Sequence, residues 1–149
     1  MKKLYSLLVF VFACVILQAQ TVEMGGDIIK IDGKEILKFQ KNKYGSFSIF
    51  NQEGDELLMY VLHNNETPSY GQDDYYTLNF LTERKKVEAI PATQTTGMFG
   101  INAKKTAEKV LSWLLREKVL NSDGTINGER VDVFVQKYHE NIQNRTIRF

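Results

Sequence analysis

Residues 103–121, AKKTAEKVLSWLLREKVLN, constrain the fold of this chain most, because they form a long segment with helical periodicity. At about 100° per residue, the apolar side chains fall on one broad stripe and the charged ones gather opposite. The stripe comprises Ala107, Val110, Leu111 and Leu114, flanked by Trp113, Leu115 and Leu120. A helix with such a broad apolar surface needs cover on two flanks, so we expect a β-sheet on one side and a second helix on the other.

The first 19 residues have the layout of a secretory signal peptide. Two lysines precede an apolar run from Leu4 to Leu17, and a cut is predicted after Ala19. The run is short for a transmembrane helix, and the alternatives are an uncleaved anchor or a lipid attached at Cys14. We expect an exported chain, periplasmic or secreted, with no stable membrane insertion after the signal is removed.

The segment from 20 to 149 has the size and charge of one ordinary domain. Without Lys2 and Lys3, 17 basic residues face 18 acidic ones, so no electrostatic surface for nucleic acid is expected. Cys14 is the only cysteine, and the mature chain therefore has neither a disulfide nor a thiol nucleophile.

Residues 20–90 predict an antiparallel β-meander of five to six strands. Asp32-Gly33 between two apolar runs is a strong hairpin signal, because both central residues of a type I′ turn need positive φ. The run Leu57 to Leu62 is apolar without a break, which indicates a central strand covered on both faces. We expect strands at 28–31, 35–41, 46–51, 56–63, 75–82 and 86–90.

A linker over 91–102 should lead into a helical pair over 103–144, followed by a short tail over 145–149. Asn102 and Asn127 are suitable N-caps for the two helices, the first of which should end near Asn121. In the second helix a single apolar stripe contains Val131, Phe134, Val135, Tyr138 and Ile142. The predicted fold class is α+β, with both helices packed on one face of the meander.

The segment between the two helices, with Gly124 and Ile126, resembles a calcium-binding EF-hand loop in part. Such a loop needs a carboxylate at its first position and a glutamate at its twelfth. Val119 and Arg130 occupy these positions, so we predict an ordinary turn and no metal. No Gly-x-Ser-x-Gly or phosphate-binding glycine pattern occurs either, and we expect no cofactor.

One polar segment, 64–76, concentrates carboxylates, amides and tyrosines between two strands. A loop of this kind on a rigid sheet is a candidate ligand or partner site, although a solvated hairpin loop has the same composition. His63 would join the loop carboxylates only if the loop folds back. The candidate binding residues are Tyr70, Asp73, Asp74, Tyr75 and His63, and we predict no catalytic set.

Two stretches carry a resemblance to other proteins. They are the start, with Ala19-Gln20 and Asp32-Gly33-Lys34, and the end, from Lys118-Val119-Leu120 through Gly128 to Tyr138. Together they resemble small exported bacterial proteins of an uncharacterised type. The resemblance implies an envelope or secreted protein without an assigned activity, and it transfers no catalytic residue.

Three functional hypotheses follow. The first is an exported, non-enzymatic interaction or binding module, with its contact surface near Leu57 to Leu62 and the 64–76 segment, whose partner is another protein or a second copy. The second is a small-ligand carrier or hydrolase with a pocket on a curled sheet, in which Asp73, Asp74 or His63 transfers protons or binds a metal. The third is an inhibitor or immunity-type protein, which the sequence does not separate from the first.

Overall fold

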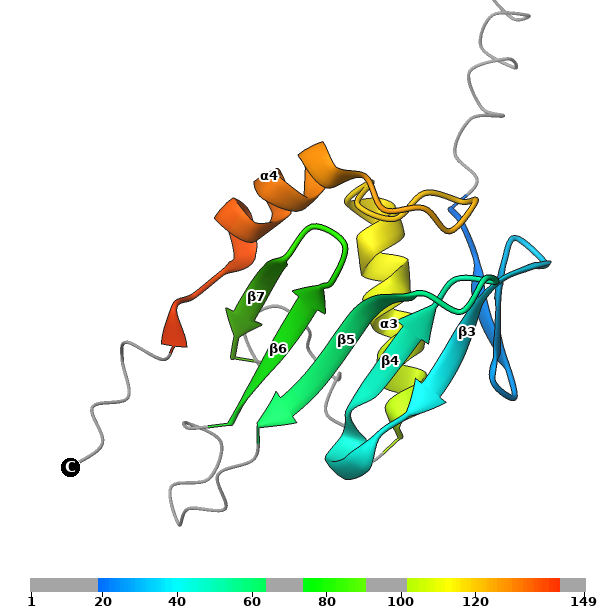
Figure 1. The fold of residues 1–149 in the computed structure, drawn as a ribbon, viewed down its shortest axis with the longest axis horizontal. Helices are drawn as coiled ribbons and strands as arrows, with labels where there is room; N and C mark the ends of the chain where they lie inside the picture. Colours follow the sequence, from blue (N-terminus) through cyan, green and yellow to red (C-terminus); the bar gives the residue numbers. More distant parts are fainter. Residues whose placement is uncertain (1–18, 64–73, 91–101, 143–149) are drawn as a thin grey trace, which may run out of the picture.

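A computed structural model describes residues 19–63, 74–90 and 102–142. It contains a seven-stranded antiparallel sheet followed by two helices, so the α+β prediction is confirmed (Figure 1). The strands pair in sequence order, with seven strands in place of five to six. They are β1 Val22–Gly25, β2 Ile28–Ile31, β3 Lys34–Lys41, β4 Phe47–Phe50, β5 Glu56–His63, β6 Tyr75–Phe80 and β7 Lys85–Ala89.

The predicted turn at Asp32-Gly33 is confirmed, but the sheet has a further strand, β1, before it. Asp32 and Gly33 join β2 to β3 with φ values of 52° and 78°, as a type I′ turn requires. β1, which is not among the strands that the sequence predicts, pairs with β2 over four residues and buries Val22. Its short length and the glycine at its end, Gly25, hide this strand from a search for alternating patterns.

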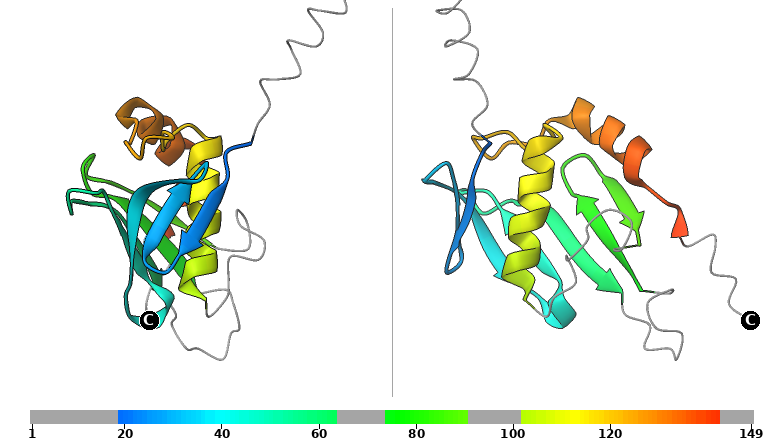
Figure 2. Two further views of the ribbon diagram at one scale, coloured as in Figure 1. Left: turned by 90° about the vertical axis from the view of Figure 1, so that its right-hand side faces the viewer. Right: turned by 180° about the vertical axis from the view of Figure 1, so that it is seen from behind.

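α3 (Ala103–Arg116) lies against the concave face of a curled sheet, with β1 curving round beside it (Figure 2). Eight of its 14 residues are buried, which is the broad apolar surface that its periodicity predicts. Irregular pairing at Ile29/Lys30 and at Ile49/Phe50 interrupts two ladders. Irregularities of this kind increase local twist and let a sheet bend around a helix.

A row of aromatic rings crosses four neighbouring strands on the concave face. Phe39, Phe47, Tyr60 and Tyr76 follow one another with ring centroids 5.7, 4.9 and 5.4 Å apart. All four are buried, and burial raises the pKa of both tyrosines far above the ordinary value. The row therefore forms the centre of the core between the sheet and α3.

α4 (Gly128–Tyr138) packs at the β7 side of the sheet, next to α3. Its Phe134 ring lies 4.6 Å from the ring of Trp113 and 5.8 Å from that of Phe80. The predicted N-caps are confirmed, since the Asn102 side chain accepts from two backbone N–H groups and that of Asn127 from one.

Both helices end earlier than predicted. α3 stops at Arg116 because Lys118 adopts φ 60°, a left-handed conformation that no helix continues through. α4 stops at Tyr138, since His139 is extended, yet Ile142 remains buried beyond the helix end.

The outer face of the sheet is defined as the face of β3–β7 turned away from α3 and α4. The continuous apolar run of β5 predicts cover on both faces, and Met59 and Val61 on the outer face are half-buried. Among the described elements, no helix lies over this face of the sheet (Figure 2). Within the described ranges, neither helix has the length and apolar character needed to cross a bilayer.

Candidate functional site

Two of the predicted binding residues meet on the outer face. His63 ends β5 and Tyr75 begins β6, and the two are direct cross-strand partners. Their rings stack with centroids 4.3 Å apart and planes 13° apart. Asp74 precedes Tyr75 and is half-buried, whereas Tyr70 and Asp73 lie outside the described residues.

The side chain of His63 forms a hydrogen bond with a hydroxyl group. Its Nε2 lies 3.0 Å from Oγ1 of Thr77, one strand away. Burial lowers the pKa of His63; Glu88 opposes this shift and Lys86 adds to it. The ring is therefore neutral at pH 7, and the described hydrogen bonds give it no carboxylate partner of the kind that orients a general base.

An ion pair on β7, formed by the exposed Lys86 and the buried Glu88, acts electrostatically on this histidine. Glu88 is 1% exposed, and its Oε1 lies 2.6 Å from Nζ of Lys86. Its backbone N–H donates to Nδ1 of His139, and its carbonyl accepts the N–H of Glu140. This cluster is not predictable from the sequence, because its members come from β7 and from the segment after α4.

The described residues contain no group of three or more histidine, cysteine or carboxylate side chains that could hold a metal ion. The outer-face cluster thus combines a stacked imidazole and phenol, a hydroxyl and a neutralised ion pair. Such an arrangement can present hydrogen-bonding and aromatic surface to a partner.

A shallow depression of about 360 Å³ extends the outer face on its β2–β4 side. Ile28 and Phe50 provide apolar walls, and Lys38 and Gln40 provide polar ones. Ile28 is 38% exposed, an unusual level for an isoleucine in a strand.

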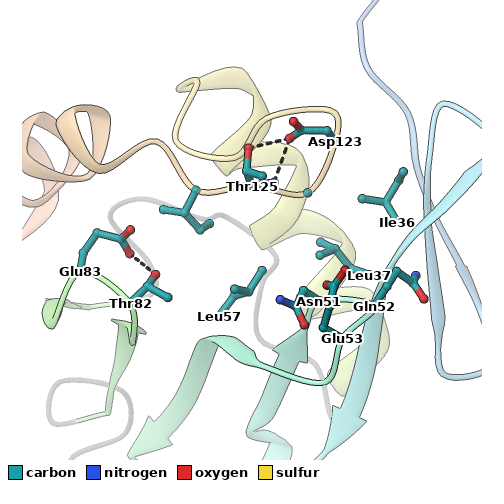
Figure 3. A pocket seen from close by; sticks show the side chains of 12 residues that line it. Ile36, Leu37, Asn51, Gln52, Glu53, Leu57, Thr82, Glu83, Asp123 and Thr125 are labelled. Carbon is teal, nitrogen blue, oxygen red and sulfur yellow. Dashed lines mark hydrogen bonds between the residues drawn. The ribbon is translucent and has the colours of Figure 1, made fainter.

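A separate hollow, the end pocket, lies where two turns of the sheet, β4–β5 and β6–β7, meet the α3–α4 loop (Figure 3). It is open to solvent and has a volume of about 400 Å³. Its floor is apolar, formed by Ile36, Leu37, Leu57 and Ile126. Its rim is polar, formed by Asn51, Gln52, Glu53, Thr82, Glu83, Asp123 and Thr125, with Gly124 between the last two.

The α3–α4 loop reaches the sheet because Gly124 is small. Gly124 is buried with φ 86°, and a Cβ atom there would lie 2.5 Å from Cγ2 of Ile36. Asp123 Oδ1 accepts from the backbone N–H and the hydroxyl of Thr125 at 2.9 and 2.6 Å. These two hydrogen bonds hold the pKa of Asp123 below its ordinary value. The segment is thus a turn packed on β3, in agreement with the sequence reading.

The other two turns of the rim are also tied by their own hydrogen bonds. The side-chain N–H of Asn51 donates to the carboxylate of Asp55 at 3.0 Å, and the Asn51 side-chain oxygen accepts the backbone N–H of Asp55 at 2.7 Å. The hydroxyl of Thr82 donates to Glu83 at 2.6 Å. The rim is therefore ordered before any ligand arrives.

Sequence reasoning did not find the end pocket, because its lining comes from four segments that are far apart along the chain. Only the stretch around Gly124 has a local pattern, and that pattern predicts an ordinary turn between the two helices. Neither His63 nor Asp74 lines the end pocket.

In the described residues, the fold is an antiparallel meander with a helix on its concave face, an outer face over which no described helix lies, and an open end pocket. No family model, no curated protein and no solved structure matches the chain.

Proposed function

We propose that the chain is an exported, non-enzymatic binding module of the bacterial cell envelope, whose outer face binds another protein. The observation that carries this proposal is the middle of that face. Met59 and Val61 on β5 are only half-buried on an interior strand of a seven-stranded sheet, where apolar side chains are ordinarily covered.

The surroundings of these two residues suit a protein partner. Phe50 and Tyr75 add half-buried aromatic side chains to either side, and methionine and aromatic residues are enriched in interfaces. The polar groups between them are already paired, as the Asn79 side chain donates to the Met59 carbonyl at 3.2 Å. A partner therefore meets an ordered surface and loses little conformational entropy on binding.

Export is the second part of the proposal. It rests on the signal-like layout of residues 1–19 and on the absence of cysteine after them. A domain of this size with a continuous core can remain folded outside the cytoplasm without disulfides.

Cross-linking combined with affinity capture tests the outer face. The 20–149 chain is expressed in its own envelope, and cross-links from Lys38 and Lys86, which border the face, are mapped by mass spectrometry. We expect one protein partner through these lysines. A cross-link between two copies would identify self-association as the form that binding takes.

Two variants make the test specific. Val61→Lys places a charge at the centre of the outer face and should reduce the captured partner at least tenfold. Val133→Lys is the matched control, because Val133 is an exposed valine on α4, 48% accessible and remote from the face. Equal capture by both variants would reject the outer face as the binding surface.

The second candidate, a hydrolase or carrier, has support only for its carrier part. A hydrolase needs at least two of its titratable groups in hydrogen-bond reach within a pocket, and the end pocket contains neither His63 nor Asp74. An inhibitor or immunity-type role uses the same outer face, so capture of a secreted toxin as the partner would identify it.

A further inference from the structure

We propose that the end pocket binds an amphipathic organic cation, that is, an ammonium or guanidinium group on an aliphatic stem. This site is distinct from the outer face and needs no partner there. The stem would lie on the apolar floor and the cation among the oxygens of the rim.

The floor has the size and rigidity of a binding site. A volume of about 400 Å³ falls within the range of roughly 300–1,000 Å³ that is usual for small-molecule pockets. Leu37 and Leu57, 1% and 8% exposed, belong to the core, and so the floor is held by strands rather than by loops. No charged side chain contributes to the floor.

The charged side chains of the rim are all acidic. Glu53, Glu83 and Asp123 come from three different turns, and no lysine, arginine or histidine lines the pocket. Lys38 on β3 donates to the Gln52 carbonyl at 2.8 Å but is not among the lining residues. An anionic ligand would therefore meet uncompensated repulsion, whereas a cation would be attracted from three sides.

The hydrogen-bonding atoms of the rim that no described hydrogen bond uses also favour a cationic ligand. The hydroxyls of Thr82 and Thr125 already donate within their own turns. By contrast, Glu83 uses only Oε2 and Asp123 only Oδ1 in the hydrogen bonds of the described chain. Apart from the Gln52 side-chain amide, the capacity that remains consists of acceptor oxygens, mainly those of the carboxylates, which match a ligand with several N–H donors.

Titration of the 20–149 chain with pentylamine, followed by ¹H–¹⁵N NMR, tests this inference. We expect saturable shifts at the backbone amides of Thr82, Gly124 and Thr125, and weaker binding as salt rises. The neutral 1-pentanol and the anionic pentanoate should each bind at least tenfold more weakly. Equal binding of pentylamine and pentanol, or no shift of these amides, would overturn the proposal.

A double variant tests whether the rim carboxylates recognise the cation. Glu53→Gln with Glu83→Gln keeps the shape of the rim and should weaken pentylamine at least tenfold. Glu129→Gln with Glu108→Gln removes the same charge from exposed positions on α4 and α3 and should have no effect. Unchanged affinity in the rim variant, with an unchanged melting temperature, would exclude the carboxylates as the recognition element.

The source of the cation is decided by comparing two further probes. Tighter binding of N-acetyl-lysine methylamide than of pentylamine identifies a lysine side chain of a peptide as the ligand. Tighter binding of 1,5-diaminopentane identifies a free amine. Val61→Lys on the outer face should change neither affinity, which separates this site from the proposed partner surface.

Discussion

At the scale of single residues, Gly124 shows how one missing side chain connects the helical layer to the sheet. Replacement by alanine adds a left-handed strain of about 1–2 kcal/mol and forces Cβ against Ile36. We expect Gly124→Ala to lower the free energy of unfolding by about 3 kcal/mol, measured by urea denaturation.

Gly33→Ala is the control for this substitution. Gly33 has a similar φ of 78° but open space around its Cβ position. It should cost only the backbone strain, about 1 kcal/mol. Equal losses in the two variants would show that the contact with Ile36 does not hold the loop.

Glu117 is the second residue whose contacts decide a measurable property. Its carboxylate accepts from the hydroxyl of Tyr138 at 2.6 Å and from Nζ of Lys137 at 3.1 Å. Partial burial raises the pKa of Glu117, but the hydrogen bonds from Tyr138 and Lys137 outweigh it and lower the pKa overall. The stabilisation is therefore present above about pH 4.5 and is lost as the pH falls through the folded-state pKa.

We expect Glu117→Gln to cost about 1 kcal/mol of unfolding free energy at pH 7, and the difference from the parent chain should shrink below pH 4.5. Denaturation between pH 3 and pH 7 measures it. Glu108→Gln on the exposed side of α3 is the matched control. A difference that stays constant down to pH 3 would contradict the hydrogen-bonded carboxylate.

At the scale of elements, the edge strand β7 is covered by the segment that follows α4. His139 accepts the N–H of Glu88 at 3.0 Å, and the Glu140 carboxylate accepts that of Ile90 at 3.3 Å. An edge covered in this way cannot pair with another chain. The end of α4 thus protects the sheet from edge-to-edge aggregation.

We expect His139→Ala to speed hydrogen exchange at the Glu88 amide at least tenfold, because the amide loses its acceptor. His139→Asn should restore much of the protection, since its side-chain oxygen can take the place of Nδ1. His63→Ala, on the outer face, serves as the control. Unchanged exchange in His139→Ala would show that the segment does not cover the edge.

The elements that the sequence predicts well are those with local signals. Alternation and the Asp32-Gly33 turn locate the strands and their order, since neighbours along the chain are neighbours in the sheet. Curvature was not predictable, because it depends on irregular pairing at Ile29/Lys30 and Ile49/Phe50. The burial of Glu88 depends on a segment about 50 residues further along the chain, as the contact with His139 shows.

The same distinction holds for the candidate sites. His63 and Tyr75 were predicted as binding residues, and the β5–β6 register brings them into contact. Tyr70 and Asp73 lie outside the described residues, so their part in that site stays a prediction. The end pocket had no local signal, since it exists only where the curled sheet meets the α3–α4 loop.

At the scale of the whole molecule, the strand order has a consequence for synthesis. Every ladder joins consecutive strands, so each strand leaving the ribosome can pair with the one made just before it. The aromatic row, however, stays exposed until α3 has been made, because α3 is the element that fills the concave face. The nascent chain therefore passes through a stage in which the sheet has formed but its apolar concave face is exposed to solvent. At this stage the chain exposes the most apolar surface for a chaperone to bind.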